Sequence, residues 1–121
     1  MRFLSMIRVQ ENTGQVPSER LMNEMGKLIE EMTRDGILVS TAGLRPTAEG
    51  FRVRYNRGKV SMTDGPFTET KEVIGGFAVL EAKSKEHAKE ITNRFLAIHG
   101  DEWNIECEVR PFDGPEFGMK A

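Results

Sequence analysis

The acidic and basic side chains that could do chemistry gather in one segment, Asp-Gly-Pro-Phe-Thr-Glu-Thr-Lys-Glu, which runs from residue 64 to residue 72. Asp-Gly-Pro is a turn sequence, because glycine accepts unusual backbone angles and proline fixes φ. A carboxylate near apolar Phe67 can have a shifted pKa, which suits a proton-transfer group. Asp64 and Glu69 are therefore candidate catalytic residues. Alternatively, Asp64 accepts hydrogen bonds from its own turn, while Glu69 and Lys71 form ordinary surface or interface ion pairs.

Other candidates lie at strand and helix ends. Arg45, beside Pro46, could hold a ligand carboxylate bidentately or cap a strand end. His99 follows a helical stripe, where the helix dipole favours a cation, so capping is favoured over catalysis. Phe67 and Phe77 could line a pocket, although such aromatic residues more often belong to a core. The predicted ligand-binding residues are Arg45, Asp64, Gly65, Pro66, Phe67, Glu69, Lys71 and Phe77.

The sequence offers no spaced set of metal ligands. Its single cysteine, Cys107, cannot form an internal disulfide, and His87 and His99 are the only imidazoles. Structural zinc needs several such ligands at characteristic spacings. We therefore expect neither a metal site nor a cofactor, and we interpret Cys107 as a buried structural thiol.

Charge and hydropathy narrow the choice of partners and location. The 17 basic and 19 acidic residues give a net charge of -2, with no concentrated basic run for a phosphate backbone, so nucleic acid is not an expected partner. No apolar run approaches the ~20 residues needed to cross a bilayer. The first residues enter a strand-like pattern without a signal-peptide cleavage site, which predicts a cytoplasmic protein that does not bind membranes.

The elements that must position these residues alternate between strand and helix. Apolar residues alternate in strands and recur at helical spacing in helices. Ser18 and Ser84 are expected N-caps. A hairpin is expected over 51–63, with one face exposed to solvent. The expected elements are a strand over 1–9, a helix over 18–35, a strand over 37–44, a hairpin over 51–63, a central strand over 73–82, a helix over 84–99 and a last strand over 103–110.

This order predicts an α+β fold, a ferredoxin-like βαββαβ arrangement with an inserted β-hairpin. A single domain is expected over residues 1–112, followed by a C-terminal tail over 113–121. Two helices can cover only one face of the sheet, whereas the first and central strands are apolar on both faces. The simplest second cover is the sheet of a twofold-related subunit, so we expect a homodimer.

The chain resembles the DGPF-domain proteins of the YCII-related family. The matching residues are Ala42-Gly43-Leu44 with Pro46, the segment from Thr63 to Glu72, Gly75-Gly76-Phe77, Ser84-Lys85-Glu86 and Glu108-Val109-Arg110-Pro111. The resemblance implies a dimeric α+β barrel from a bacterium, and some relatives are encoded beside alternative sigma factors. Members of the broader group carry a His-Asp pair with the histidine on the first helix, and a few act as lyase-like or dehalogenating enzymes. The helix over 18–35 contains no histidine, so Asp64 is carried over only as a pocket residue.

Two functions fit these observations. The first is a homodimeric binding or regulatory module for a small polar or anionic metabolite, with a possible link to alternative sigma factor systems. The alternative is a cofactor-independent enzyme, lyase-like or monooxygenase-like, in which Asp64 or Glu69 transfers a proton. The missing helix histidine favours the binding module.

Overall fold

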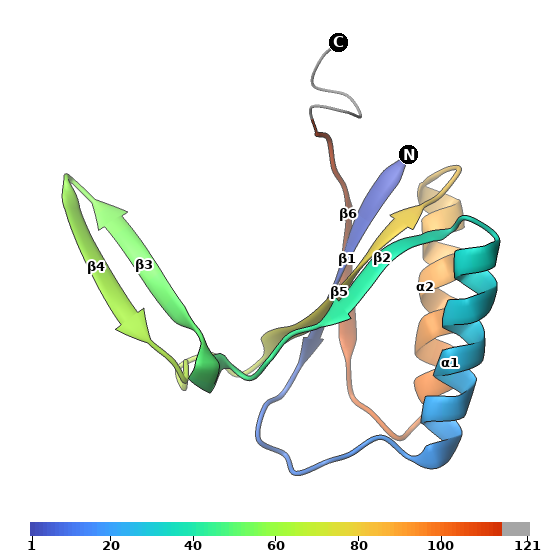
Figure 1. Ribbon diagram of the computed structural model, residues 1–121, viewed down its shortest axis with the longest axis horizontal. Coiled ribbons are helices and arrows are strands. Elements are labelled where there is room, and N and C mark those ends of the chain that lie inside the picture. Colours follow the sequence, from blue (N-terminus) through green and yellow to red (C-terminus); the bar gives the residue numbers. More distant parts are fainter. Residues whose placement is uncertain (115–121) are drawn as a thin grey trace.

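The structure is a computed structural model that describes residues 1–114 (Figure 1). Its elements follow the order predicted from the sequence, with a short 3-10 helix added before the hairpin. They are β1 (Arg2–Val9), α1 (Glu19–Arg34), β2 (Leu38–Gly43), η1 (Thr47–Glu49), β3 (Phe51–Asn56), β4 (Lys59–Asp64), β5 (Val73–Glu81), α2 (Lys85–His99) and β6 (Glu106–Pro111).

Four strands form an antiparallel sheet in the order β2-β5-β1-β6. Both helices lie on one face of this sheet, and the β3–β4 hairpin projects from the opposite side (Figure 1). The central position of β5 and the split βαβ connections confirm the predicted ferredoxin-like α+β fold.

Local signals in the sequence explain where the helices begin and which side they bury. Ser18 Oγ accepts a hydrogen bond from the Leu21 amide at 3.1 Å, and Ser84 Oγ accepts one from the His87 amide at 3.1 Å, so both predicted N-caps are confirmed. The apolar stripes of the two helices then pack on the sheet around Phe3. The buried core consists of Phe3, Leu28, Met32, Leu80, Ala82, Ala88 and Ile91.

A β-bulge interrupts the pairing of the two central strands at Gly75. Ile7 pairs with Gly76 and Arg8 with Ile74, which leaves Gly75 as the extra residue. A Cβ at Gly75 would lie 2.6 Å from Val9 Cγ2, so only glycine fits there without a shift. The sequence-based prediction of a bulge or a close approach at this position is confirmed.

The sheet face opposite the helices is apolar at its centre. Leu4 pairs with Val79 and Met6 with Phe77 across β1 and β5, and these side chains alternate with the helix-facing residues. Along one side of this face, Arg8 forms an ion pair of 3.5 Å with Glu108. Neither helix covers this face, as the sequence pattern predicted (Figure 1).

The hairpin differs from expectation, because both of its faces are open to solvent. Every residue of β3 and β4 is exposed, including Phe51 at 66%, Tyr55 at 72% and Met62 at 73%. The expectation of one wet face assumed that the apolar side of the hairpin packs on its own chain. Within the described residues the hairpin instead projects away from the core (Figure 1).

The last strand begins later than the sequence pattern predicted. Its pairing with β1 ends at Arg8 and Glu106, whereas the predicted strand began at Trp103. The apolar alternation in the sequence extends back to Trp103. In the structure, the Trp103 side chain lines a cavity and does not occupy a position in the sheet. Of the predicted tail, residues 115–121 lie outside the described residues, and the domain boundary at residue 112 stays a prediction. No helix within residues 1–114 is long and apolar enough to span a membrane.

Candidate functional site

The Asp-Gly-Pro turn at the base of the hairpin packs closely against η1. The Gly65 amide donates a hydrogen bond of 2.9 Å to the Gly50 carbonyl, and the Gly65–Pro66 peptide bond is cis. A Cβ at Gly65 would lie 1.7 Å from the Thr47 carbonyl oxygen, which no side chain could accommodate. This contact explains why glycine is needed in the turn.

Thr47 connects this turn to the loop that follows β1. The Glu11 carboxylate accepts hydrogen bonds from the Thr47 hydroxyl at 2.6 Å and from the Thr47 amide at 2.7 Å. These bonds, the hydroxyl bond foremost, hold the pKa of Glu11 below its usual range. The Phe67 amide donates in turn to the Thr47 hydroxyl at 3.3 Å. Sequence reasoning missed Glu11, since nothing in its local pattern indicates a partner 36 residues away.

Two of the charged candidates, Glu69 and Arg45, form ion pairs with side chains that were not among the candidates. Glu69 forms an ion pair with Arg52, whose guanidinium carbon lies 3.8 Å from the centre of the Phe67 ring. A hydrogen bond from its own backbone and then the bond from Arg52 lower the pKa of Glu69. Arg45 pairs with Glu49 at 3.0 Å. The ionic partner of Glu69 is therefore Arg52 and not Lys71.

The remaining predicted residues are dispersed. Asp64 is exposed at the end of β4, opposite Phe51, and Lys71 is exposed after the turn. Phe77 lies on the sheet face opposite the helices, where it pairs with Met6. The structure thus brings together the turn and Glu69, but it places Phe77 and His99 elsewhere.

A cavity of about 520 Å³ lies between the sheet and the two helices. We call it the helix-side cavity. Its volume is within the ~300–1,000 Å³ of typical ligand pockets. His99 is its one ionisable lining side chain, and none of the eight predicted ligand-binding residues is among its lining residues within the described chain. It is lined by Ser5, Ile7, Val9, Met25, Leu28, Ile29, Met32, Leu38, Thr41, Ala42, Gly43, Gly75, Gly76, Ala78, Leu80, Ile91, Thr92, Phe95, His99 and Trp103.

His99 and Trp103 are two of the polar side chains that line this cavity, together with Ser5, Thr41 and Thr92. His99 Nδ1 lies 2.9 Å from the Phe95 carbonyl oxygen, which can only accept, so Nδ1 donates this hydrogen bond and Nε2 is the ring nitrogen that the bond does not occupy. This bond within the last turn of α2 agrees with the predicted capping role. The Trp103 indole Nε1 is buried and has no hydrogen-bond partner among residues 1–114. Buried donors are rarely left unpaired, so this N–H is a candidate partner for a ligand or an ordered water.

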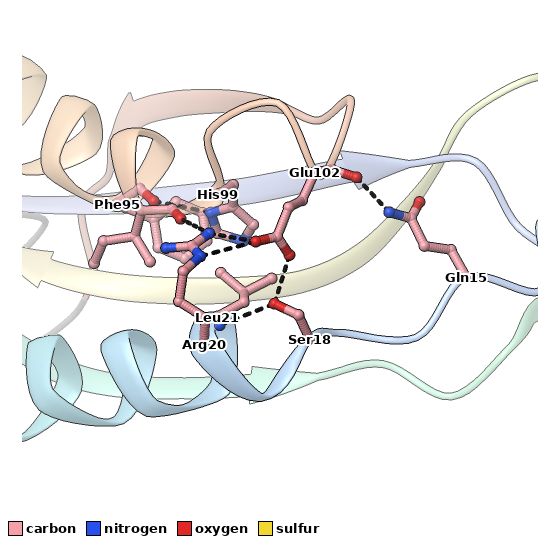
Figure 2. Close-up of polar contacts among 8 residues, drawn as sticks. Gln15, Ser18, Arg20, Leu21, Phe95, His99 and Glu102 are labelled. Carbon is pink, nitrogen blue, oxygen red and sulfur yellow. Dashed lines mark hydrogen bonds and ion pairs between the residues drawn. The ribbon is translucent and has the colours of Figure 1, made fainter.

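Glu102, next to Trp103, fixes the segment that carries the indole (Figure 2). Its carboxylate accepts hydrogen bonds from Ser18 Oγ at 2.7 Å and from Arg20 Nε at 2.9 Å. The hydrogen bond from Ser18, followed by that from Arg20, lowers the pKa of Glu102, and the charge of His99 adds to this effect. These residues join the start of α1 to the loop after α2.

A second hollow, of about 640 Å³, lies between α2 and β6 and includes Cys107 in its lining. Burial raises the pKa of the Cys107 thiol, which makes it a poor nucleophile and agrees with a structural role. No side-chain atom of its described lining is both buried and unpartnered. Among residues 1–114, no group of three or more histidine, cysteine or acidic residues is placed to hold a metal ion. The helix-side cavity is therefore the better candidate site.

Comparison with known proteins places the chain in a family without fixing its activity. An uncharacterised protein of Rhizobium meliloti (strain 1021) is 33% identical over 70 residues, which are 58% of this chain and 56% of that protein. The chain thus spans little more than half the length of this relative. The model of the YCII-related domain matches residues 1–112. The chain belongs to the YCII-related domain family.

Proposed function

We propose that this protein is a homodimeric small-molecule-binding module whose ligand occupies the helix-side cavity. The observation that carries the proposal is the Trp103 indole N–H, which is buried without a partner in the described chain and belongs to a residue that lines the cavity. An unpaired buried donor costs about 1–3 kcal/mol. A ligand that supplies an acceptor gains this hydrogen bond without any further desolvation of the indole.

The lining favours a neutral, mostly apolar ligand that carries a carbonyl-like acceptor. Apart from His99, the lining side chains of the cavity carry no ionisable group. A charged ligand would lose its hydration here without meeting an opposite charge. The sequence predicted a polar or anionic metabolite between sheet and helices, oriented by Arg45, Asp64, Glu69 and Lys71. This ligand class and the link to alternative sigma factors stay predictions.

A pair of isosteric probes tests the ligand class. Acetophenone carries a carbonyl oxygen where α-methylstyrene carries a methylene group. We expect the ketone to bind roughly fivefold more tightly, because one net hydrogen bond contributes about 1 kcal/mol. Calorimetric titration of both compounds measures this ratio.

Trp103→Phe is the matched variant, because it keeps a six-membered aromatic ring and removes the pyrrole part of the indole with its N–H. It should bind both probes equally, while the wild type discriminates between them. If the wild type binds neither probe, the cavity is not the ligand site. If the variant keeps the preference for the ketone, the indole is not the donor.

The open sheet face supports the homodimer. Leu4, Met6, Phe77 and Val79 form its apolar centre, and the ion pairs of Arg8 flank it, an arrangement typical of an interface core with a polar rim. Met6→Glu should therefore yield a monomer in sedimentation analysis. Met22→Glu, on the exposed surface of α1, is the control that should leave the dimer intact. A wild-type monomer would refute this part of the proposal.

One observation favours the enzymatic alternative, and it concerns His99. Its Nδ1 is engaged with the Phe95 carbonyl, so Nε2 is available as a base within the cavity lining. Such a base would remove a proton from the carbon beside a carbonyl group. In heavy water, protein-catalysed deuterium exchange into the acetophenone methyl group that is lost in His99→Gln would establish an enzyme. An exchange rate equal to that of buffer would support the binding module.

A further inference from the structure

We infer that Glu102 is a positioning residue: it fastens the 100–105 segment to the start of α1 and thereby holds Trp103 against the helix-side cavity. This inference rests on the proposed binding function, since it assigns the residue that orients the ligand's hydrogen-bond donor. Glu102 itself does not line the cavity.

Glu102 is tied by both its side chain and its backbone. Carboxylate Oε2 accepts from Ser18 Oγ, and Oε1 accepts from both Nε and Nη2 of Arg20, so the planar guanidinium holds this oxygen with two donors. The backbone carbonyl of Glu102 accepts from the Gln15 side chain, and its amide donates to the His99 carbonyl at 3.1 Å. Figure 2 shows the side-chain contacts converging on Glu102 from the segment before α1 and from the first turn of α1.

These contacts join the two helices that line the cavity. Residues of both helices line the cavity, among them Leu28 of α1 and Phe95 of α2. Arg20 Nη2 also donates to the Ile98 carbonyl at 2.9 Å, so the start of α1 is joined to the end of α2. Trp103 follows Glu102 directly, and a residue next to a fixed backbone has little freedom to leave the cavity.

Without the Glu102 carboxylate, the segment retains few restraints. Gly100 and Asp101 are exposed turn residues, and the β6 ladder begins only at Glu106. A segment with few buried contacts opens locally at small cost. Loss of the carboxylate should therefore release Trp103 and leave the sheet and helices intact.

Trp103 is the only tryptophan in the chain, so its fluorescence reports directly on the segment. In the ligand-free protein, we expect Glu102→Gln to increase quenching by acrylamide about twofold and to shift the emission to longer wavelength, because local opening exposes the indole. Arg20→Gln should produce the same change. Arg20→Lys, which keeps the charge without the planar guanidinium, should give an intermediate value.

Glu31→Gln is the matched control. Glu31 pairs with Arg94 and so also joins α1 to α2 through a glutamate–arginine contact, but it does not touch the 100–105 segment. Glu31→Gln should lower the melting temperature as much as Glu102→Gln does. Its acrylamide quenching and emission wavelength should equal those of the wild type. Equal quenching in both variants would show a general loosening and would overturn the inference, as would unchanged quenching in Glu102→Gln.

The ligand arm of the experiment separates this inference from the proposed function. Glu102→Gln should reduce the fivefold preference for acetophenone over α-methylstyrene to less than about twofold, since the N–H is no longer held in place. If the wild type shows no preference while Glu102→Gln exposes Trp103, the proposed ligand class fails and the positioning role stands. If the preference persists with an exposed Trp103, Glu102 does not position the donor.

Discussion

The base of the hairpin and the helix-side cavity satisfy their polar groups in opposite ways. At the hairpin base, Glu11 pairs with Thr47, Glu69 pairs with Arg52, and the Gly65 amide bonds to the Gly50 carbonyl. At the cavity, the Trp103 N–H is buried without a partner in the described chain. Polar groups that satisfy one another hold a structure together, whereas an unsatisfied buried group is available to a ligand. In our proposal, the most distinctive sequence motif therefore builds the fold, and less distinctive residues line the proposed site.

Gly65→Ala tests whether the turn at the hairpin base is needed for the fold, and it should have the largest effect. Its methyl group would collide with the Thr47 backbone, so we expect a loss of roughly 2–4 kcal/mol in the free energy of unfolding, measured with urea. Gly26→Ala in α1 is a control glycine substitution that should change stability in the opposite direction. Nothing lies within 4 Å of the added methyl group, and the variant should gain about 1 kcal/mol from helix propensity. Wild-type stability of Gly65→Ala would show that the turn does not build the fold.

Thr47→Val tests the same network through hydrogen bonds alone. The variant keeps the shape of the side chain and removes the hydroxyl that contacts Glu11 and Phe67, so it should lose about 1 kcal/mol of stability. Thr92→Val removes a hydroxyl that only bonds back to the Ala88 carbonyl of its own helix, and it should be close to neutral. If Thr92→Val loses as much stability as Thr47→Val does, the hydroxyl of Thr47 has no special role at the hairpin base.

Acidification should weaken the hairpin base through Glu11. The folded-state pKa of Glu11 is lowered, so its stabilising effect is complete above the unfolded pKa and is lost as the pH falls through the folded value. The melting temperature at fixed protein concentration should therefore stay level near neutral pH and fall below the usual carboxyl range. Glu11→Gln should make this fall shallower. A slope identical to that of the wild type would contradict the assignment.

The smallest effect is expected at Arg45. Its pair with Glu49 is solvent-exposed and spans four residues of one turn, so solvent screens it. Arg45→Ala should leave the melting temperature within about 1 °C of the wild type. It should also leave acetophenone affinity unchanged, because Arg45 does not line the cavity. A weaker affinity in this variant would return the predicted Arg45 clamp to consideration.

Periodicity and capping residues predicted most of the fold but little of the site. Ser18, Ser84 and the apolar stripes predicted both helices, and Gly75 predicted the bulge. The pattern could not show that the hairpin projects from the core, because alternation indicates a face and not the surface it meets. It also assigned Trp103 to a strand. His99 was named as a candidate, but its cavity forms from residues up to about a hundred positions apart, which only the tertiary fold brings together.

A titration of the ¹⁵N-labelled protein with acetophenone, followed through its amide and indole N–H resonances, tests the central claim most directly. The chain has one tryptophan, so the indole N–H of Trp103 gives a single resolved signal. We expect this signal to move on addition of the ketone, in the wild type and equally in an Asp64→Ala, Glu69→Ala double variant, while the amides of residues 64–72 stay in place. Movement of those turn amides with a stationary indole signal, abolished in the double variant, would place the ligand at the hairpin base and contradict the account.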